Sequence, residues 1–255
     1  MKIDAKKLKN NLDSFYTIVE SYQSISSTND LLKEVASSFP EGTIFLANEQ
    51  SKGKGRNGRD FLSQADKGLY MSVLLKPQFD IKTSLTITAC AAVSVAKAIE
   101  TLYHKQIQIK WINDITYKQK KLGGILVESG LQANQSQVDY FVVGIGINVY
   151  KQDFPEPLNE IASTLEAHIK NVDRFALAVA ILNNFATLYA SLAQNTWYEP
   201  YLRFSSVYHA SIKVLANPPY DAYVENIDPY GQLHVIKEDQ TREIINSGEI
   251  SIRLK

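Results

Sequence analysis

A basic, glycine-rich segment, SKGKGRNGRD at residues 51–60, limits what this chain can fold into because it separates two apolar runs. Glycine loses much backbone entropy on folding and clustered like charges repel, so the segment is a poor helix or strand former. The flanking runs, GTIFLANE at 42–49 and LYMSVLL at 69–75, read as strands. We therefore predict a loop between two strands, which is either simply solvated or built to receive an anion.

Two familiar nucleotide-binding motifs are nearly matched, and both fail on inspection. Gly53 and Gly58 have the spacing of a phosphate-binding P-loop, but Arg59 and Asp60 stand where that loop needs Lys and Ser or Thr. The segment GIGIN at 144–148 begins like a dinucleotide fingerprint, yet no helix-forming segment follows it. An anion-binding role for the loop must therefore rest on other residues.

The remaining pattern predicts an α+β fold. Apolar residues recur at helical spacing over 27–39, 83–103 and 173–195. Strands are predicted at 106–111, 121–129 and 138–149, while the polar stretch at 113–121 is read as a turn. From about residue 208, short β-prone runs separated by turns suit a small β-barrel. We expect a mixed sheet flanked by helices over residues 1–205, and a barrel over 206–255.

Composition excludes several classes of function. Lys and Arg number 27, and so do Asp and Glu, so no overall charge attracts nucleic acid or a membrane surface. The single cysteine, Cys90, cannot form an intrachain disulfide and is predicted to be a buried helical thiol. The four histidines lack the spacing of zinc ligands. No apolar run suits a signal peptide or a membrane span, and we expect a cytoplasmic protein.

Five motifs occur in series along the chain. They are STN at 27–29, Gln50 with the basic loop, KWIND at 110–114, KLGGILVE at 121–128 and GIGIN at 144–148. Together with GEISIR at 248–253, this series resembles the biotin protein ligase family over nearly the whole chain. That family usually has GRGRxGR and KWPND, so Lys54 and Ile112 depart from it. Lys54 keeps the positive charge but loses the planar fork of arginine.

The resemblance implies an ATP-dependent biotin–protein ligase with an α+β catalytic domain and an SH3-like C-terminal barrel. Such an enzyme converts biotin and ATP into biotinyl-5'-adenylate and pyrophosphate, with Mg²⁺ as cofactor. It then transfers biotin to a lysine of the apo biotin carboxyl carrier domain of acetyl-CoA carboxylase. We expect the form that lacks the DNA-binding domain, with no DNA or membrane partner, as a monomer or homodimer.

The resemblance also implies roles for individual residues, with Arg56 and Lys121 as the catalytic cations. The residues implied for biotin binding are Ser27, Thr28, Asn29, Gln50, Gly53, Lys54, Gly55, Arg56, Lys121, Gly124 and Gly144. Those implied for nucleotide binding are Lys54, Arg56, Lys110, Asn113, Lys121 and Asn148. Asp114 is the expected Mg²⁺ ligand, because a carboxylate oxygen suits that ion beside phosphates.

Each assignment has a structural alternative. Residues 27–29 also suit a helix cap, Gln50 a strand end, Lys110 and Lys121 solvated strand ends, and Asp114 an Asx turn. Two other functions stay open, which are lipoate–protein ligation and a silent biotin- or nucleotide-binding module. For the basic loop we predict a mobile flap that closes over bound anions and keeps water from the adenylate.

Overall fold

The computed structural model describes residues 2–77, 83–131, 138–246 and 252–254. Its larger sheet has seven strands in the order β1-β2-β3-β7-β6-β5-β4. Strands β1 and β2 are parallel and the other neighbours are antiparallel, so the sheet is mixed. The strands are β1 (Val19–Tyr22), β2 (Ile44–Ala47), β3 (Gly68–Leu75), β4 (Gln108–Lys110), β5 (Asp114–Tyr117), β6 (Lys120–Leu131) and β7 (Val138–Asn148).

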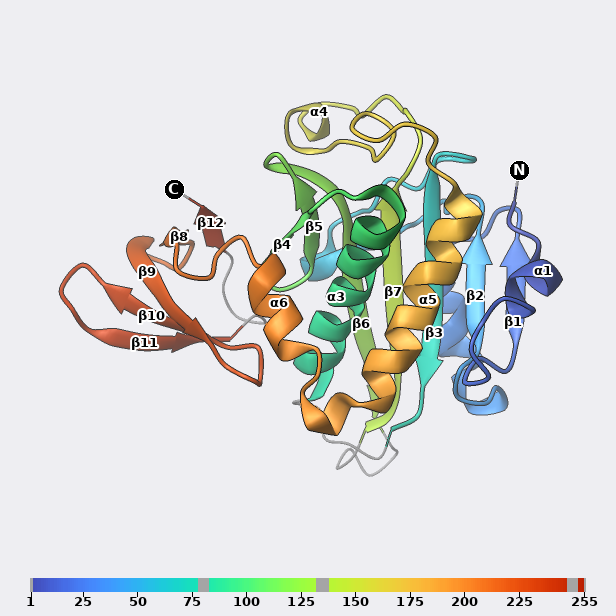
Figure 1. Ribbon diagram of the computed structural model, residues 1–255, viewed down its shortest axis with the longest axis horizontal. Helices are drawn as coiled ribbons and strands as arrows, with labels where there is room; N and C mark the ends of the chain where they lie inside the picture. Colours follow the sequence, from blue (N-terminus) through green and yellow to red (C-terminus); the bar gives the residue numbers. More distant parts are fainter. Residues whose placement is uncertain (1, 78–82, 132–137, 247–251, 255) are drawn as a thin grey trace.

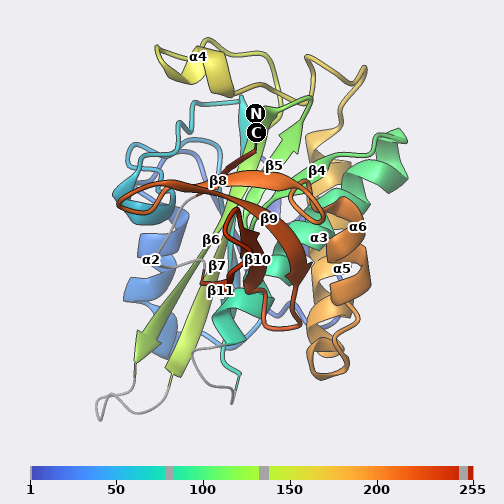
Figure 2. The ribbon, with the colours of Figure 1, turned by 90° about the vertical axis from the view of Figure 1, so that its left-hand side faces the viewer.

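Helices cover both faces of this sheet, which explains why strand β3 is buried along its whole length. On one face lie α3 (Thr83–Tyr103), α5 (Arg174–Ala190) and α6 (Tyr198–Phe204), as Figure 1 shows. On the other face lies α2 (Thr28–Glu34), which the turned view separates clearly from α3 and α5 (Figure 2). All eight residues of β3 are buried, because a strand covered on both sides has no solvent face.

Shorter helical elements lie before and between the main ones. They are α1 (Ala5–Lys9), α4 (Leu158–Ile161) and 3-10 turns at Ala36–Ser38, Arg56–Gly58 and Leu192–Gln194. Helix α2 begins after Ser27, whose hydroxyl accepts a hydrogen bond from the Asp30 amide. Helix α5 begins after Asp173, whose carboxylate accepts from the amides of Phe175 and Ala176 at 2.8 and 3.1 Å. Both are standard N-caps that satisfy otherwise unpaired amides.

A second, antiparallel sheet of five strands follows α6, in the order β11-β10-β9-β8-β12. Its strands are β8 (Ser211–Val214), β9 (Tyr220–Ile227), β10 (Leu233–Lys237), β11 (Arg242–Ile245) and β12 (Ile252–Leu254). Two hydrogen bonds join it to the larger unit. The Trp111 indole donates to the Gly231 carbonyl at 2.8 Å, and the Tyr198 hydroxyl donates to the Ile227 carbonyl at 2.6 Å. The small sheet is thereby held beside the KWIND segment.

The α+β prediction is confirmed, as are the three helices and the buried position of Cys90. The prediction of a turn over 113–121 is wrong, because Asp114–Tyr117 forms β5. Only Lys118 and Gln119 make the turn, with φ of 48° and 63°. Positive φ at both central residues is the geometry of a two-residue type I′ hairpin turn, which usually contains Asn or Gly.

Three further outcomes concern the rest of the chain. Helix α1 and strand β1 were not predicted. The last of the β-prone runs predicted after residue 208 is described only at Ile252–Leu254, since 247–251 lie outside the described residues. Within the described ranges, none of the helices combines the length and apolar character that crossing a membrane would need.

Candidate active site

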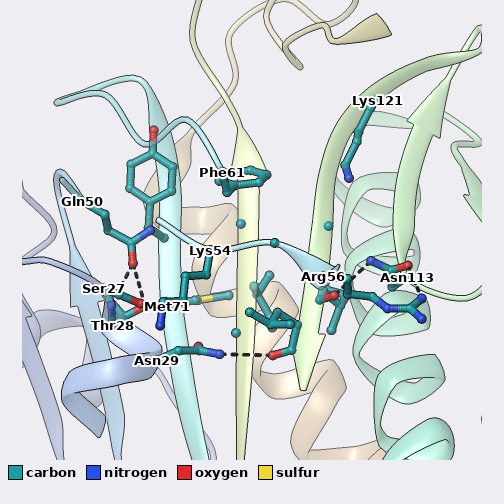
Figure 3. A pocket seen from close by; sticks show the side chains of 18 residues that line it. Ser27, Thr28, Asn29, Gln50, Lys54, Arg56, Phe61, Met71, Asn113 and Lys121 are labelled. Carbon is teal, nitrogen blue, oxygen red and sulfur yellow. Dashed lines mark hydrogen bonds between the residues drawn. The ribbon is translucent and has the colours of Figure 1, made fainter. Parts of the chain in front are cut away.

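A cleft of about 490 Å³, its open mouth included, lies over strands β3, β7 and β6 (Figure 3). The N-terminal end of α2 borders it on one side, and the basic loop crosses it. Predicted site residues that line it are Ser27, Thr28, Asn29, Gln50, Lys54, Gly55, Arg56, Asn113, Lys121, Gly124 and Gly144. The sequence motifs, which are up to about a hundred residues apart, therefore converge on one place.

One side of the cleft, here called the neutral wall, is formed by Thr28, Asn29 and Gln50. The Gln50 side-chain oxygen accepts from the Thr28 amide at 2.8 Å and from its hydroxyl at 3.1 Å. The Gln50 amide nitrogen donates to the Ser63 hydroxyl at 2.9 Å, which fixes which end of the amide faces Thr28. Gln50 is thus more than a polar strand end, because it ties α2 to the segment that follows the loop.

Asn29 is also firmly fixed, and it is buried, with only 4% of its surface exposed. Its side-chain oxygen accepts from the Ser72 hydroxyl, and its nitrogen donates to the Glu128 carboxylate at 2.8 Å. A Cβ atom at Gly144 would lie 2.4 Å from the Asn29 oxygen. Glycine is therefore needed at 144, because it lets α2 approach the sheet this closely. The sequence had assigned Gly144 to biotin binding and had not predicted this structural role.

The basic loop is fastened at two points, of which Figure 3 draws the one between Arg56 and Asn113. The Lys54 ammonium contacts the Asp30 carboxylate at 2.7 Å, and the Arg56 guanidinium donates to the Asn113 side-chain oxygen at 3.0 Å. At the base of the loop, a Cβ on Gly53 would lie 2.3 Å from the Phe61 carbonyl oxygen. Only glycine allows the two arms of the loop to approach this closely. That the loop moves stays a prediction.

The opposite side, here called the charged wall, is formed by Arg56, Asn113 and Lys121, with Asp114 behind them. The Lys121 ammonium donates to the Asp114 carboxylate at 2.7 Å, and the Asn113 amide donates to the same oxygen at 3.2 Å. Burial lowers the pKa of the Arg56 guanidinium, while the nearby Asp114 carboxylate acts in the opposite direction. Arginine stays protonated in either case, so this wall presents two cations.

Some predicted site residues lie outside the lining of the cleft. Lys110 is on the edge strand β4, where it pairs in register with Asp114. Asn148, only 4% exposed, donates to the Ser163 carbonyl at 3.2 Å and accepts from Gln152 at 3.3 Å. Gly53 acts through loop geometry, as described above. Nucleotide-binding roles for Lys110 and Asn148 stay proposals. The two hydrogen bonds of the Asn148 side chain also give it a structural role.

Sequence reasoning missed the apolar floor of the cleft. It is lined by Phe61, Tyr70, Met71, Ile125, Leu126 and Ile145. Phe61 lies against the backbone of Gly146, where a Cβ would be 2.8 Å from the ring. The other five come from strands whose apolar residues read simply as core. Alternation could have found Tyr70 and Leu126, since residues two apart on a strand share a face and these two pair in register with Gly146 and Gly144 of β7.

The next feature is the arrangement of side chains that could coordinate a metal ion. Among the described residues, no group of three or more His, Cys, Asp and Glu side chains is arranged to hold one. Asp114 is engaged by Lys121. The residues therefore do not fit a metal site made by the protein alone.

Comparison with known proteins agrees with this geometry. Bifunctional ligase/repressor BirA of Bacillus subtilis (strain 168) is 39% identical over 169 residues, covering 65% of this chain and 51% of that protein. The chain thus spans about half the length of this Bacillus relative. The biotin–[acetyl-CoA-carboxylase] ligase of Mycobacterium tuberculosis is 26% identical over 166 residues, covering 63% of this chain and 59% of that protein.

The fold has a match among solved structures that extends over nearly the whole chain. The biotin protein ligase from Aquifex aeolicus in complex with biotin and ATP superposes with a TM-score of 0.81 and 28% identity, covering 94% of this chain and 100% of that one. The sequence pattern of one family matches residues 21–148, half of the chain, and that range includes every residue lining the cleft. The chain belongs to the biotin/lipoate A/B protein ligase family.

Proposed function

We propose that the protein is an ATP-dependent biotin–protein ligase. One observation carries the proposal, namely that cations from two segments, Lys54 and Arg56 of the basic loop and Lys121 of β6, lie at a cleft whose other surfaces are neutral or apolar. A carboxylate and a polyphosphate repel each other, and fixed cations are the means of bringing them together. The relatives named as biotin ligases support biotin as the acid.

In the first step, a carboxylate oxygen of biotin attacks the α-phosphorus of ATP. The bond from that phosphorus to the bridging oxygen breaks, and pyrophosphate leaves with the electron pair. The attacking acid is already ionised at neutral pH, so the step needs no general base. Lys121 and Arg56 reduce the repulsion between the two anions, which grows as the new bond forms. The product is the mixed anhydride biotinyl-5'-adenylate.

In the second step, the amine of an acceptor lysine attacks the acyl carbon of the adenylate. The acyl–oxygen bond breaks, AMP leaves, and the amine loses a proton as the amide forms. Until that attack, the anhydride must be kept from water. The basic loop lies across the cleft between Asp30 and Asn113, which is the place where a cover over the anhydride would be needed.

The rest of the cleft suits the remainder of biotin. Its ureido group is neutral and both donates and accepts hydrogen bonds, which matches the amides and hydroxyls of the neutral wall. Its fused rings and aliphatic chain are apolar, and Phe61, Tyr70 and Leu126 offer apolar surface. A neutral head group at one end and a carboxylate at the other agree with the separation of neutral and charged walls.

The proposed reaction also involves a metal ion and an acceptor protein. We propose that Mg²⁺ accompanies ATP as part of the substrate, and that Asp114 would be its protein ligand. The acceptor would be the apo biotin carboxyl carrier domain of acetyl-CoA carboxylase, as the name of the Mycobacterium tuberculosis relative suggests for that protein. We place the reaction in the cytoplasm, without DNA, in a monomer or homodimer.

Intact mass spectrometry tests the function directly. The protein is incubated with ATP, Mg²⁺, biotin and an apo carrier domain, and the carrier should gain one biotinyl group. Replacing biotin with lipoate provides the matched control. A lipoyl group on the carrier, with no biotinyl group, would assign the other branch of the family. Pyrophosphate release without carrier distinguishes an enzyme from a silent binding module, which would bind ligand but release none.

A further inference from the structure

An acidic residue outside the sequence motifs contacts the basic loop. Asp30, in the first turn of α2, does not line the cleft, yet its two oxygens contact the Lys54 ammonium at 2.8 and 2.7 Å. The Asp30 side chain is 24% exposed and that of Lys54 is 44% exposed. The pair is thus only partly screened by solvent, and it connects α2 to the loop directly.

Asp30 is itself held from the other side. The Lys33 ammonium lies 3.0 Å from the same carboxylate, and Lys33 also pairs with Glu128 on β6. Burial alone would raise the pKa of Asp30, but hydrogen bonds from Lys54 and Lys33 keep it below its ordinary value. Since Glu128 also accepts from Asn29, a continuous row of contacts runs from the loop to the neutral wall.

These contacts differ from an isolated surface ion pair. A lone exposed pair contributes little, because two long side chains must be ordered to make it, whereas a network with one rigid member keeps more of its electrostatic gain. Asp30 has a short side chain on a helix whose neighbouring residues, Ser27, Thr28 and Asn29, are all less than 5% exposed. The rigid end of the contact is therefore Asp30, and the end that becomes positioned is Lys54.

We propose that Asp30 is a positioning residue that fixes the first arm of the basic loop over the cleft through Lys54. The bond from Arg56 to Asn113 fixes the second arm. This assigns Lys54 a task that differs from the direct ligand contact implied by the motif. Positioning of the loop stands on these contacts alone, while its consequence, retention of an adenylate, rests on the proposed function.

The ligand-free protein provides the first measurement, by amide hydrogen exchange. The reporters are the Gly55 amide, which donates to Arg59, and the Phe61 amide, which donates to Gly53. Asp30→Asn and Lys54→Met should each speed their exchange about 3- to 5-fold, the size expected for a favourable surface network. The double variant should exceed neither single variant, because both remove one interaction. Asp30→Glu and Lys54→Arg should stay close to the parent.

Lys52→Met is the matched control, since it removes the same charge from the same loop. Among the residues that the structure describes, Lys52 forms no ion pair, and its side chain is exposed. Its exchange should be unchanged, and exchange in β7 should be unchanged in every variant. Unaltered exchange in Asp30→Asn, multiplying effects in the double variant, or an equal effect of Lys52→Met would each overturn the proposal.

The second measurement follows the consequence for the intermediate. After reaction with biotin and ATP, Asp30→Asn should release biotinyl-adenylate about 3- to 5-fold faster, while the rate of its formation changes less than about twofold. Slower release would mean that Asp30 competes with ligand for Lys54, which contradicts positioning. If even the parent protein forms no adenylate, the proposed function fails, while the ligand-free exchange result still decides the role of Asp30.

Discussion

The two walls of the cleft are held in place by different interactions. On the neutral wall, Thr28 and Asn29 are each 4% exposed, and their polar atoms are satisfied by neighbouring protein groups. On the charged wall, Lys121 is 36% exposed and depends on a single carboxylate, that of Asp114. One wall is therefore a buried surface with a fixed pattern of donors and acceptors, and the other carries cations on long side chains with few protein partners.

This difference suits two tasks that a ligase must combine. Recognition of a neutral head group requires preorganised hydrogen bonds, because any unsatisfied polar group left in a buried wall is costly. Handling of phosphates and a carboxylate requires cations that can exchange a protein partner for a ligand oxygen. Variants of the neutral wall should therefore change biotin affinity, and variants of the charged wall should change the rate of adenylate formation.

Lys121→Ala should have the largest effect. Loss of a positioned cation that stabilises developing charge costs about 10²- to 10³-fold in rate in comparable sites. Single-turnover pyrophosphate release should fall by this amount, whereas biotin affinity measured by calorimetry should change much less. An unchanged rate would exclude Lys121 as the catalytic cation, and a loss confined to biotin affinity would contradict the division between the walls.

Gly144→Ala tests the neutral wall. The added Cβ would lie 2.4 Å from the Asn29 oxygen, and Ser72 and Glu128 prevent Asn29 from retreating. Such overpacking typically costs 1–3 kcal/mol, so biotin affinity should fall about 10- to 100-fold. Gly124→Ala is the matched comparison on the charged wall, because its nearest contacts would be at an ordinary 3.5 Å. Equal losses in both variants would remove the contrast between the walls.

Asp114→Asn separates two roles for one carboxylate. If Asp114 orients Lys121, the variant should slow adenylate formation about 10-fold, with no change in the Mg²⁺ concentration that gives half the maximal rate. The amide retains an oxygen for Asn113 but not the charge that attracts the ammonium. A higher Mg²⁺ requirement would instead support Asp114 as a metal ligand. The measurement is a Mg²⁺ titration of single-turnover pyrophosphate release in parent and variant.

How far the sequence predicted this molecule depended on the range of the interactions. Long periodic segments such as α3 and β7 were predictable, because local pattern decides them. Strand β5 was not, since its hairpin turn uses Lys118 and Gln119 in place of Asn and Gly. The sequence could not show that Asn148 bonds to Ser163, because the segment carrying Ser163 has no motif of its own.

For the cleft, too, the local motifs could be predicted and the long-range contacts could not. Motif residues that line the cleft were identified, including Gln50 and Lys121. The contact that holds Asn29 was missed, because its partner Glu128 is 99 positions away and the two meet only when α2 packs on β3 and β7, beside β6. The substitution at position 112 has a simple structural outcome, as Ile112 is 1% exposed in the core and Asn113 keeps its place in the cleft.

The smallest predicted effect concerns the pH dependence of the Asp30 network. Hydrogen bonds from Lys54 and Lys33, against the opposing effect of burial, hold the pKa of Asp30 below its ordinary value. A lowered folded-state pKa means that the stabilisation is complete above the unfolded pKa of about 3.9 and is lost as pH falls through the folded value. Since the carboxylate is partly exposed, the gain should not exceed about 1 kcal/mol. The difference in unfolding free energy between the parent and Asp30→Asn, measured with denaturant, should be constant from pH 5 to 8 and should shrink below about pH 4. A difference that changes between pH 6 and 8 would point to a histidine-dependent contact and not to this carboxylate.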